Sequence, residues 1–247
     1  MPQKIDVRGV RFDNVTLDEA ADFLRREAAR GVQTAVYTPN AEIVQMCVED
    51  AALRETVNGA GLLIPDGIGV IKAARILGTP LKGKVAGVDL GRRVLAFSAE
   101  DGLGVFFLGG KPGVSETAAA RMTEAHPGLR VAGTHDGYFA KTGEENEAVL
   151  TEIRESGAEV LFVCLGAPTQ EKWIAQNRAA LPGVRLLLGL GGSLDIYAGT
   201  VRRAPKLFIR LGLEWLYRLL SDPRRIGRMM RLPKFYFGTW KYKFAKR

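Results

Sequence analysis

Six short apolar runs alternate with longer stretches of helical periodicity, and this alternation constrains the fold more than any other feature of the sequence. The runs are QTAVYTP (33–39), GLLIPD (61–66), GVFFLGG (104–110), LRVAGTHDGYF (129–139), EVLFVCLGAP (159–168) and VRLLLGLGG (184–192). The segments between them, such as 40–60 and 115–126, repeat apolar residues at helical spacing. We therefore predict an α/β fold, with a Rossmann-like, mostly parallel sheet and helices on both faces.

The ends of these predicted strands indicate where a ligand would bind. In an open parallel sheet, ligands bind just beyond the carboxyl ends of the strands. Here those ends carry Gly, Pro and polar residues, which allow close approach to the backbone and supply direct contacts. Gly and Pro also end strands that bind nothing, so a single loop is ambiguous. Together, the six loops are expected along one edge of the sheet, which we call the rim, and as a set they predict a ligand-binding site.

One strand end carries a lone acid. In LLIPDGIGV (62–70), Asp66 follows a buried-looking run and stands between Pro65 and Gly67. A carboxylate held in this way can serve as a general base. It can also cap the helix that is predicted to start near Ile68. The residues alone leave both interpretations open.

The C-terminal segment differs from the rest of the chain. The chain has 247 residues, and we predict a core over residues 1–200 and an appendage over 201–247. Residues 201–247 hold 14 Lys/Arg and two acids, a formal charge of +12, so a total of +8 leaves −4 for the first 200 residues. Nine of the 20 aromatic residues also lie there. This asymmetry points to an anionic partner.

The segment 204–222 is predicted to form one amphipathic helix that ends at Pro223. It places Leu207, Leu211, Trp215 and Leu219 roughly on one face. Basic and aromatic residues on such a helix suit a membrane interface. Docking of the apolar face on the core is the alternative, but docking alone does not explain the aromatic residues that follow.

Several common kinds of site have no signature in the sequence. There is no GxxxxGK[ST] loop, no HExxH and no clustered histidine, so neither a catalytic metal nor a common nucleotide cofactor is supported. Cys47 and Cys164 lack disulfide or metal spacing, which favours a reducing compartment. No run approaches the roughly 20 apolar residues of a membrane span. The first residues lack a signal-peptide core, so we expect a cytoplasmic protein.

Seven motifs in a fixed order resemble the WecG/TagA/CpsF glycosyltransferases. They are TPNAEIV, IPDGIGV, KVAGVDL, FFLGGKPGV, HDGYF, CLGAPTQEKWI and GLGGSLDIYAGTVRRAP, and the resemblance covers residues 5–240. It implies an inverting, metal-independent hexosyltransferase. The donor would be a UDP-sugar, such as UDP-N-acetylmannosamine or a related hexose or uronic acid. The acceptor would be an undecaprenyl-diphosphate-linked sugar at the cytoplasmic membrane face, and the product would enter a surface polysaccharide. No cofactor is implied.

The resemblance also assigns roles to residues near the acceptor. Asp66 becomes the base that deprotonates the attacking hydroxyl. Thr38 and Asn40 become acceptor-positioning residues, although Asn40 is also a good helix N-cap. Lys84 stands where the family usually has Arg, so it can neutralise phosphate but cannot form a bidentate fork. Asp89 of the same motif is expected to brace or cap a loop.

The UDP site is expected on the later loops. Tyr138 would stack on uracil, and Asp195 would accept a hydrogen bond from the imide N–H. Gly109, Gly110 and Gln170 would contact ribose or phosphate. A core aromatic is the alternative for Tyr138, and a loop or helix cap is the alternative for Asp195.

The resemblance further implies that the appendage folds over the site when the enzyme sits on the membrane. Arg218, Arg225 and Arg228 would then reach the UDP diphosphate, or they would bind anionic lipid instead. A homo-oligomer is plausible, since related proteins associate through the core. Two other functions compete. A basic-tailed nucleic-acid-binding protein leaves the strand-end loops unexplained, and a Rossmann enzyme with another nucleotide cofactor lacks the glycine fingerprint.

Overall fold

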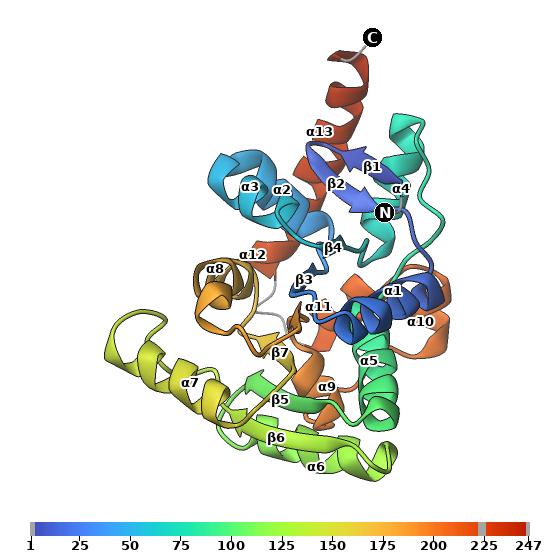
Figure 1. The fold of residues 1–247 in the computed structure, drawn as a ribbon. Coiled ribbons are helices and arrows are strands. Elements are labelled where there is room, and N and C mark those ends of the chain that lie inside the picture. The colour runs from blue at the N-terminus through green and yellow to red at the C-terminus, as the bar shows by residue number, and fades with distance from the viewer. Residues whose placement is uncertain (1–2, 222–225, 246–247) are drawn as a thin grey trace.

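The computed structural model describes residues 3–221 and 226–245. Within these residues, six strands form one parallel sheet in the order β4-β3-β8-β7-β5-β6 (Figure 1). They are β3 (Thr34–Tyr37), β4 (Leu62–Leu63), β5 (Gly104–Gly109), β6 (Arg130–His135), β7 (Val160–Cys164) and β8 (Leu186–Gly189). Each lies inside one of the apolar runs, so the predicted α/β class is confirmed.

Helices cover both faces of this sheet because successive strand residues point to opposite sides. Tyr37, Leu108 and Leu187 face one helical layer, and Val36, Phe107 and Leu188 face the other. The first layer contains α2 (Ala41–Glu49), α3 (Ala51–Asn58), α4 (Ile68–Leu77), α7 (Glu144–Glu155) and α8 (Thr169–Asn177). The second contains α1 (Leu17–Ala29), α5 (Gly87–Asp101), α6 (Val114–Ala125) and α9 (Ser193–Tyr197). Because the six strands are parallel, their carboxyl ends all lie along one edge of the sheet, between the two layers.

Two predicted helices are each divided in the structure. The pattern over 40–60 forms α2 and α3, because Asp50 leaves the helical conformation and its Oδ1 accepts from the Leu53 N–H at 3.0 Å. The pattern over 204–222 forms α10 (Lys206–Arg210) and α11 (Glu214–Ser221). Gly212, with φ of 70°, separates these two helices. The single amphipathic helix that we predicted there is therefore wrong.

An N-terminal hairpin, which no pattern in the sequence predicted, lies beside β4 of the sheet. Strands β1 (Lys4–Val7) and β2 (Val10–Asp13) pair antiparallel around a turn in which Arg8 adopts a φ of 57°. The Arg8 guanidinium donates to Gln45 Oε1 at 2.7 Å and to the Phe235 carbonyl at 3.1 Å. This one side chain therefore joins the hairpin to α2 and to the last helix of the chain.

That last helix, α13 (Arg231–Ala245), has one docked face and one exposed face. It packs against α2 and α4, with Phe235 fully buried in the core and Thr239 buried beside it. The opposite face exposes Phe237, Trp240 and Phe244, with the rings of Trp240 and Phe244 stacked. In Figure 1 this helix runs past the hairpin and carries the C-terminus at its far tip.

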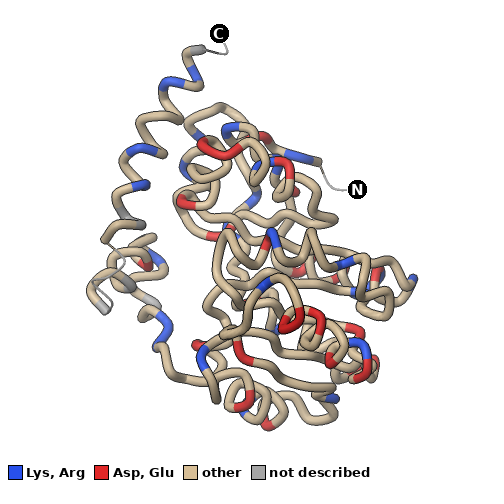
Figure 2. Tube along the Cα trace, turned by 90° about the vertical axis from the view of Figure 1, so that its left-hand side faces the viewer, with Lys and Arg blue, Asp and Glu red and all other residues tan. Residues whose placement is uncertain are grey.

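The C-terminal helices concentrate the basic residues. Figure 2 shows Lys and Arg along this segment with few acids between them. The short helix α12 (Ile226–Met229) precedes α13. Several large apolar side chains on α10 to α13 are more than half exposed, among them Leu207, Leu220, Ile226 and Phe237. In the described part of the chain, no helix combines the length and the apolar character needed to cross a bilayer.

Candidate active site

Backbone hydrogen bonds beyond the strands place Asp66 beside the end of β3. The Ile64 N–H donates to the Tyr37 carbonyl at 3.1 Å, and the Asp66 N–H donates to the Pro39 carbonyl at 3.3 Å. The pairing of β3 with β4 thus continues into both loops. Asp66 is half-buried, and the N-cap of α4 is Gly67, which has no side chain to cap the helix. Asp66 therefore stands one residue before the cap position.

Thr38 and Asn40 lie on the adjoining loop, directly after β3. The buried Thr38 Oγ1 donates to the Gly189 carbonyl at the end of β8, at 3.2 Å. Gly87, the first residue of α5, lies so close that an added Cβ would come within 3.2 Å of the Thr38 methyl. Asn40 caps α2, because its Oδ1 accepts from the Ile43 N–H at 3.1 Å. The capping role is thus observed, and an acceptor-positioning role for Asn40 stays a prediction.

A second loop brings charge to the same place. The Val85 N–H donates to the Pro65 carbonyl at 3.0 Å, so Lys84 lies next to the β4 end. The Lys84 ammonium pairs with Glu214 of α11 at 2.5 Å. The Arg203 guanidinium forms a fork with Asp89 of α5, with both contacts at 2.6 Å. The expected bracing role of Asp89 is therefore what the structure shows.

Arg203 and Glu214 were not selected from the sequence. The hydrogen-bonded Asp89 carboxylate raises the pKa of Arg203, and smaller contributions come from the charges of Glu214 and Asp66. These groups are thus electrostatic neighbours at the β4 end of the rim. The available signals were the position of Arg203 inside the last quoted motif and that of Glu214 as a rare acid in a basic segment.

The glycine loop after β5 lies further along the rim. Gly109 has φ of 131°, and an added Cβ would stand 2.4 Å from the Cys164 carbonyl oxygen, so only glycine fits there. The Gly110 carbonyl accepts from the Gly137 N–H at 2.8 Å, which joins this loop to the loop after β6. Gly109, Gly110 and the HDGYF loop, which carries Tyr138, are therefore neighbours.

Tyr138 is exposed on the loop after β6, whereas Asp195 is half-buried on α9, which follows β8 and packs against α6. Tyr138 is 70% exposed, and its backbone N–H donates to Asp136 Oδ1 at 2.7 Å. The alternative of a core aromatic is therefore wrong, and the ring is available for stacking. Asp195 lies in the first turn of α9, where its backbone carbonyl accepts from Thr200 Oγ1 at 3.0 Å.

Gln170 sits behind the loops. It is buried in the first turn of α8, where its Nε2 donates to Glu171 Oε1 at 2.9 Å and its Oε1 accepts from the Gly191 N–H at 2.9 Å. Both ends of its amide are thus satisfied by protein atoms. Contact of Gln170 with ribose or phosphate stays a prediction.

The strand order sets the distance between the two halves of the candidate site. Asp66 and Thr38 belong to β4 and β3, whereas the glycine loop follows β5, with β8 and β7 in between. Four strand spacings of about 4.8 Å separate β4 from β5 by roughly 19 Å. An extended sugar nucleotide lying along the rim is of this scale. Arg225 lies outside the described residues, as do the side chains of Arg218 in α11 and Arg228 in α12.

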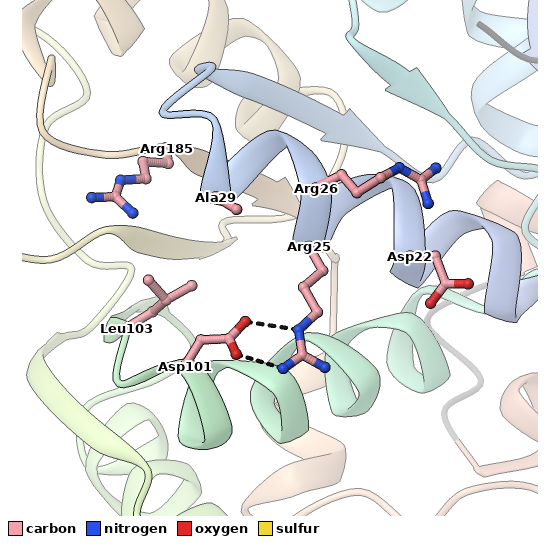
Figure 3. Close-up of a pocket in the computed structure, with 7 residues that line it drawn as sticks. All are labelled: Asp22, Arg25, Arg26, Ala29, Asp101, Leu103 and Arg185. Atoms are coloured by element: carbon pink, nitrogen blue, oxygen red, sulfur yellow. Dashed lines mark hydrogen bonds and ion pairs between the residues drawn. The ribbon is translucent and has the colours of Figure 1, made fainter.

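Two pockets lie elsewhere and contain none of the predicted site residues. The first, about 520 Å³, is at the amino ends of β5 and β8, between α1 and the end of α5 (Figure 3). Its Arg25 is held by Asp101, while Arg26 and Arg185 extend in different directions. The cations therefore do not converge on a ligand. No group of His, Cys, Asp and Glu suited to a metal ion is found among residues 3–221 and 226–245.

Comparison with known proteins identifies the family. The model of the "Glycosyl transferase WecG/TagA/CpsF family" matches residues 5–247. This chain belongs to that family. It is therefore a glycosyltransferase, as the motifs predicted.

Curated relatives from three bacterial species match this chain over most of its length. A protein of Bacillus spizizenii is 35% identical over 210 residues, which cover 85% of this chain and 80% of the relative. One of Staphylococcus aureus is 34% identical over 245 residues, 98% of this chain and 92% of the relative. One of Bacillus subtilis is 30% identical over 230 residues, which cover 93% of this chain and 88% of the relative. Each is named N-acetylglucosaminyldiphosphoundecaprenol N-acetyl-beta-D-mannosaminyltransferase.

Proposed function

We propose that this glycosyltransferase moves N-acetylmannosamine from a UDP-activated donor to N-acetylglucosamine carried on undecaprenyl diphosphate, in the assembly of a surface polysaccharide. The names of three relatives that match at least 85% of this chain support the choice of sugar and acceptor. The observation that carries the proposal is the placement of Asp66 beside the loop of Thr38 and Asn40 by the Asp66–Pro39 backbone hydrogen bond. This bond brings Asp66 next to the loop that carries Thr38 and Asn40, beyond the adjoining ends of β4 and β3.

The proposed reaction is a direct displacement at the anomeric carbon. The Asp66 carboxylate takes the proton of the acceptor hydroxyl, whose oxygen forms the new bond to that carbon. The bond from the same carbon to the UDP phosphate oxygen breaks, and UDP leaves with the electron pair. Attack and departure on opposite faces invert the configuration. Thr38 and Asn40 hold the acceptor sugar, and no metal takes part.

The leaving diphosphate needs positive charge, and the structure offers two cations near the β4 end. Lys84 and Arg203 each already hold a carboxylate there. We assign Lys84 to the diphosphate, and Arg218, Arg225 and Arg228 of the appendage to the same anion when the appendage closes over the site. Gly109, Gly110 and Tyr138 of the loops after β5 and β6, together with Asp195 of α9, would hold the uridine.

The appendage is proposed to hold the enzyme on the inner face of the cytoplasmic membrane. Phe237, Trp240 and Phe244 form an exposed aromatic row on α13, and Lys243 lies 5.5 Å from the centroid of the Trp240 ring. Aromatic rings at headgroup depth with cations beside them suit anionic lipid. The lipid-linked acceptor would meet the enzyme at this surface.

The roles proposed for Asp66 and Asp195 are tested by replacing each carboxylate separately, because one variant should affect kcat and the other UDP binding. In an assay with UDP-N-acetylmannosamine and a lipid-linked N-acetylglucosamine acceptor, Asp66→Asn is expected to lower kcat by about 10²- to 10⁴-fold with unchanged UDP affinity. Asp195→Asn is expected to weaken UDP binding instead. EDTA should leave the wild-type rate unchanged. An Asp66→Asn enzyme that retains wild-type kcat would remove the base assignment, and inhibition by EDTA would remove the metal-free mechanism.

A further inference from the structure

A buried acid that the proposed reaction does not use lies directly behind the rim. Glu171 is the third residue of α8, and 1% of its surface is exposed. Burial raises the pKa of its carboxyl, and within the described part of the chain its Oε2 has no hydrogen-bond partner. A polar group left in this state costs stability, and an apolar side chain would avoid the cost. Its presence therefore calls for a reason other than packing.

The other carboxyl oxygen starts a chain of hydrogen bonds toward the site. Glu171 Oε1 accepts from Gln170 Nε2 at 2.9 Å, and Gln170 Oε1 accepts from the Gly191 N–H at 2.9 Å. Because Nε2 faces the acid, Oε1 must face Gly191, so Glu171 fixes which way the Gln170 amide is turned. The buried hydroxyl of Tyr37 also donates to the Glu171 carbonyl, at 3.2 Å.

The end of β8 is shaped to receive this amide. A Cβ on Gly189 would stand 3.2 Å from Gln170 Nε2 and 3.3 Å from the Tyr37 ring, so a side chain there would crowd both. The Gly189 carbonyl in turn accepts from Thr38 Oγ1. The Gln170 amide is thus packed against the end of β8, the strand that lies between β3 and β7.

Gly191 is where the chain turns from β8 into α9. It adopts a φ of 57°, and α9 begins two residues later and carries Asp195 in its first turn. An amide held at Gly191 therefore fixes the start of the helix on which the uracil-binding acid is placed. A loop of this kind contributes to affinity only if its backbone is held before the ligand arrives.

We propose that Glu171 is a positioning residue, which acts through Gln170 to hold the Gly191 turn and the start of α9 in the conformation that binds UDP. This inference rests on the proposed function, because it takes the α9 end of the rim as the nucleotide site. It also gives Gln170 a role as the link between Glu171 and Gly191, in place of direct contact with ribose or phosphate.

The test is a cycle of variants measured by UDP titration calorimetry of the full chain. Glu171→Met removes the acceptor for Gln170 and is expected to raise the Kd of UDP about tenfold. Glu171→Gln keeps a carbonyl acceptor and should restore wild-type affinity. Gln170→Leu alone and the double variant Glu171→Met/Gln170→Leu should show the same Kd, because Glu171 acts only through Gln170. Glu147→Met, an exposed change in the first turn of α7, is the control with unchanged affinity.

Two results would overturn the proposal. One is unchanged UDP affinity in Glu171→Met, and the other is losses that add in the double variant. Hydrogen exchange at the Gly191 amide supplies a readout that does not need UDP. It should quicken in Glu171→Met and Gln170→Leu, and not in Glu171→Gln. If wild-type protein does not bind UDP, the proposed donor fails, and the exchange rates still decide whether Glu171 holds this turn.

Discussion

Replacement of Phe235 by alanine tests whether the last helix belongs to the folding unit of the core. Phe235 is fully buried and lies in the same hydrophobic cluster as Val70 and Ile71 of α4. The Arg8 guanidinium lies 5.6 Å from its ring centroid and also contacts its carbonyl. The side chain therefore links α13 to residues that stand more than 160 positions earlier in the sequence.

The size of the effect follows from this burial. Truncation of a fully buried Phe to Ala costs about 3–5 kcal/mol in unfolding free energy, from lost transfer energy and the cavity that remains. For a domain of this length each kcal/mol lowers Tm by 2–4 °C, so Phe235→Ala should lower Tm by roughly 6–20 °C. Differential scanning calorimetry measures this directly. A single transition that moves as a whole is expected if α13 unfolds with the core.

Phe237, two residues further along the same helix, is the matched control. It is 76% exposed, so Phe237→Ala should change the unfolding free energy by no more than about 0.5 kcal/mol. Phe237→Ala should instead weaken cosedimentation with anionic vesicles, because it removes part of the exposed aromatic row. An unchanged Tm in Phe235→Ala would refute the reasoning. It would mean that α13 detaches without unfolding the core, as a separate appendage from residue 201 would do.

Two further predictions concern single charges. Glu214→Gln should tighten UDP binding by about 1.4- to 5-fold in calorimetry, the range that corresponds to 0.2–1 kcal/mol for a partly exposed pair, because it releases Lys84 for the diphosphate. Weaker binding would mean that Glu214 holds Lys84 in place, and Lys84→Gln should weaken binding in either case. The raised pKa of Glu171 means that the folded state keeps this proton at a pH where the unfolded state has lost it. The unfolding free energy should therefore fall as pH rises above about 4.3, the ordinary glutamate pKa, and Glu171→Gln should reduce this slope in urea titrations at several pH values. If Glu171→Gln leaves the slope unaltered, Glu171 is not the source of this pH dependence.

The strand positions were predictable because each strand is buried on both faces. A strand of this kind is a near-continuous apolar run, and its end shows as a change to Gly, Pro or a polar residue. Asp66, Thr38 and the glycine loop after β5 were selected by this rule, and the structure places each of them at a strand end. The breaks at Asp50 and Gly212 were missed, because a helical period continues through a residue whose own preference is to end a helix.

The contacts between distant segments could not be predicted in the same way. The pairs Lys84–Glu214, Asp89–Arg203 and Arg8–Phe235 join residues that are 114 to 227 positions apart. Periodicity reports only which face of an element is apolar, and not which other element will cover it. The burial of Gln170 is a similar case. Its polar side chain in a loop motif suggested a ligand contact, while its partners are a neighbouring glutamate and the backbone of a strand-end loop.

The sequence by itself determined the α/β class, the six strands of the sheet, the rim on which the motifs lie and the family to which they belong. These features follow from local patterns, because short stretches of sequence already contain the apolar runs of buried strands and the residues that form turns. Only the tertiary structure decided that β8 and β7 separate the loops of Asp66 and Thr38 from the glycine loop after β5, and that α13 is docked through Phe235. It alone showed that Gln170 and Glu171 stand behind the rim. Strand order and helix docking depend on the packing of the whole chain, which no local stretch of residues specifies.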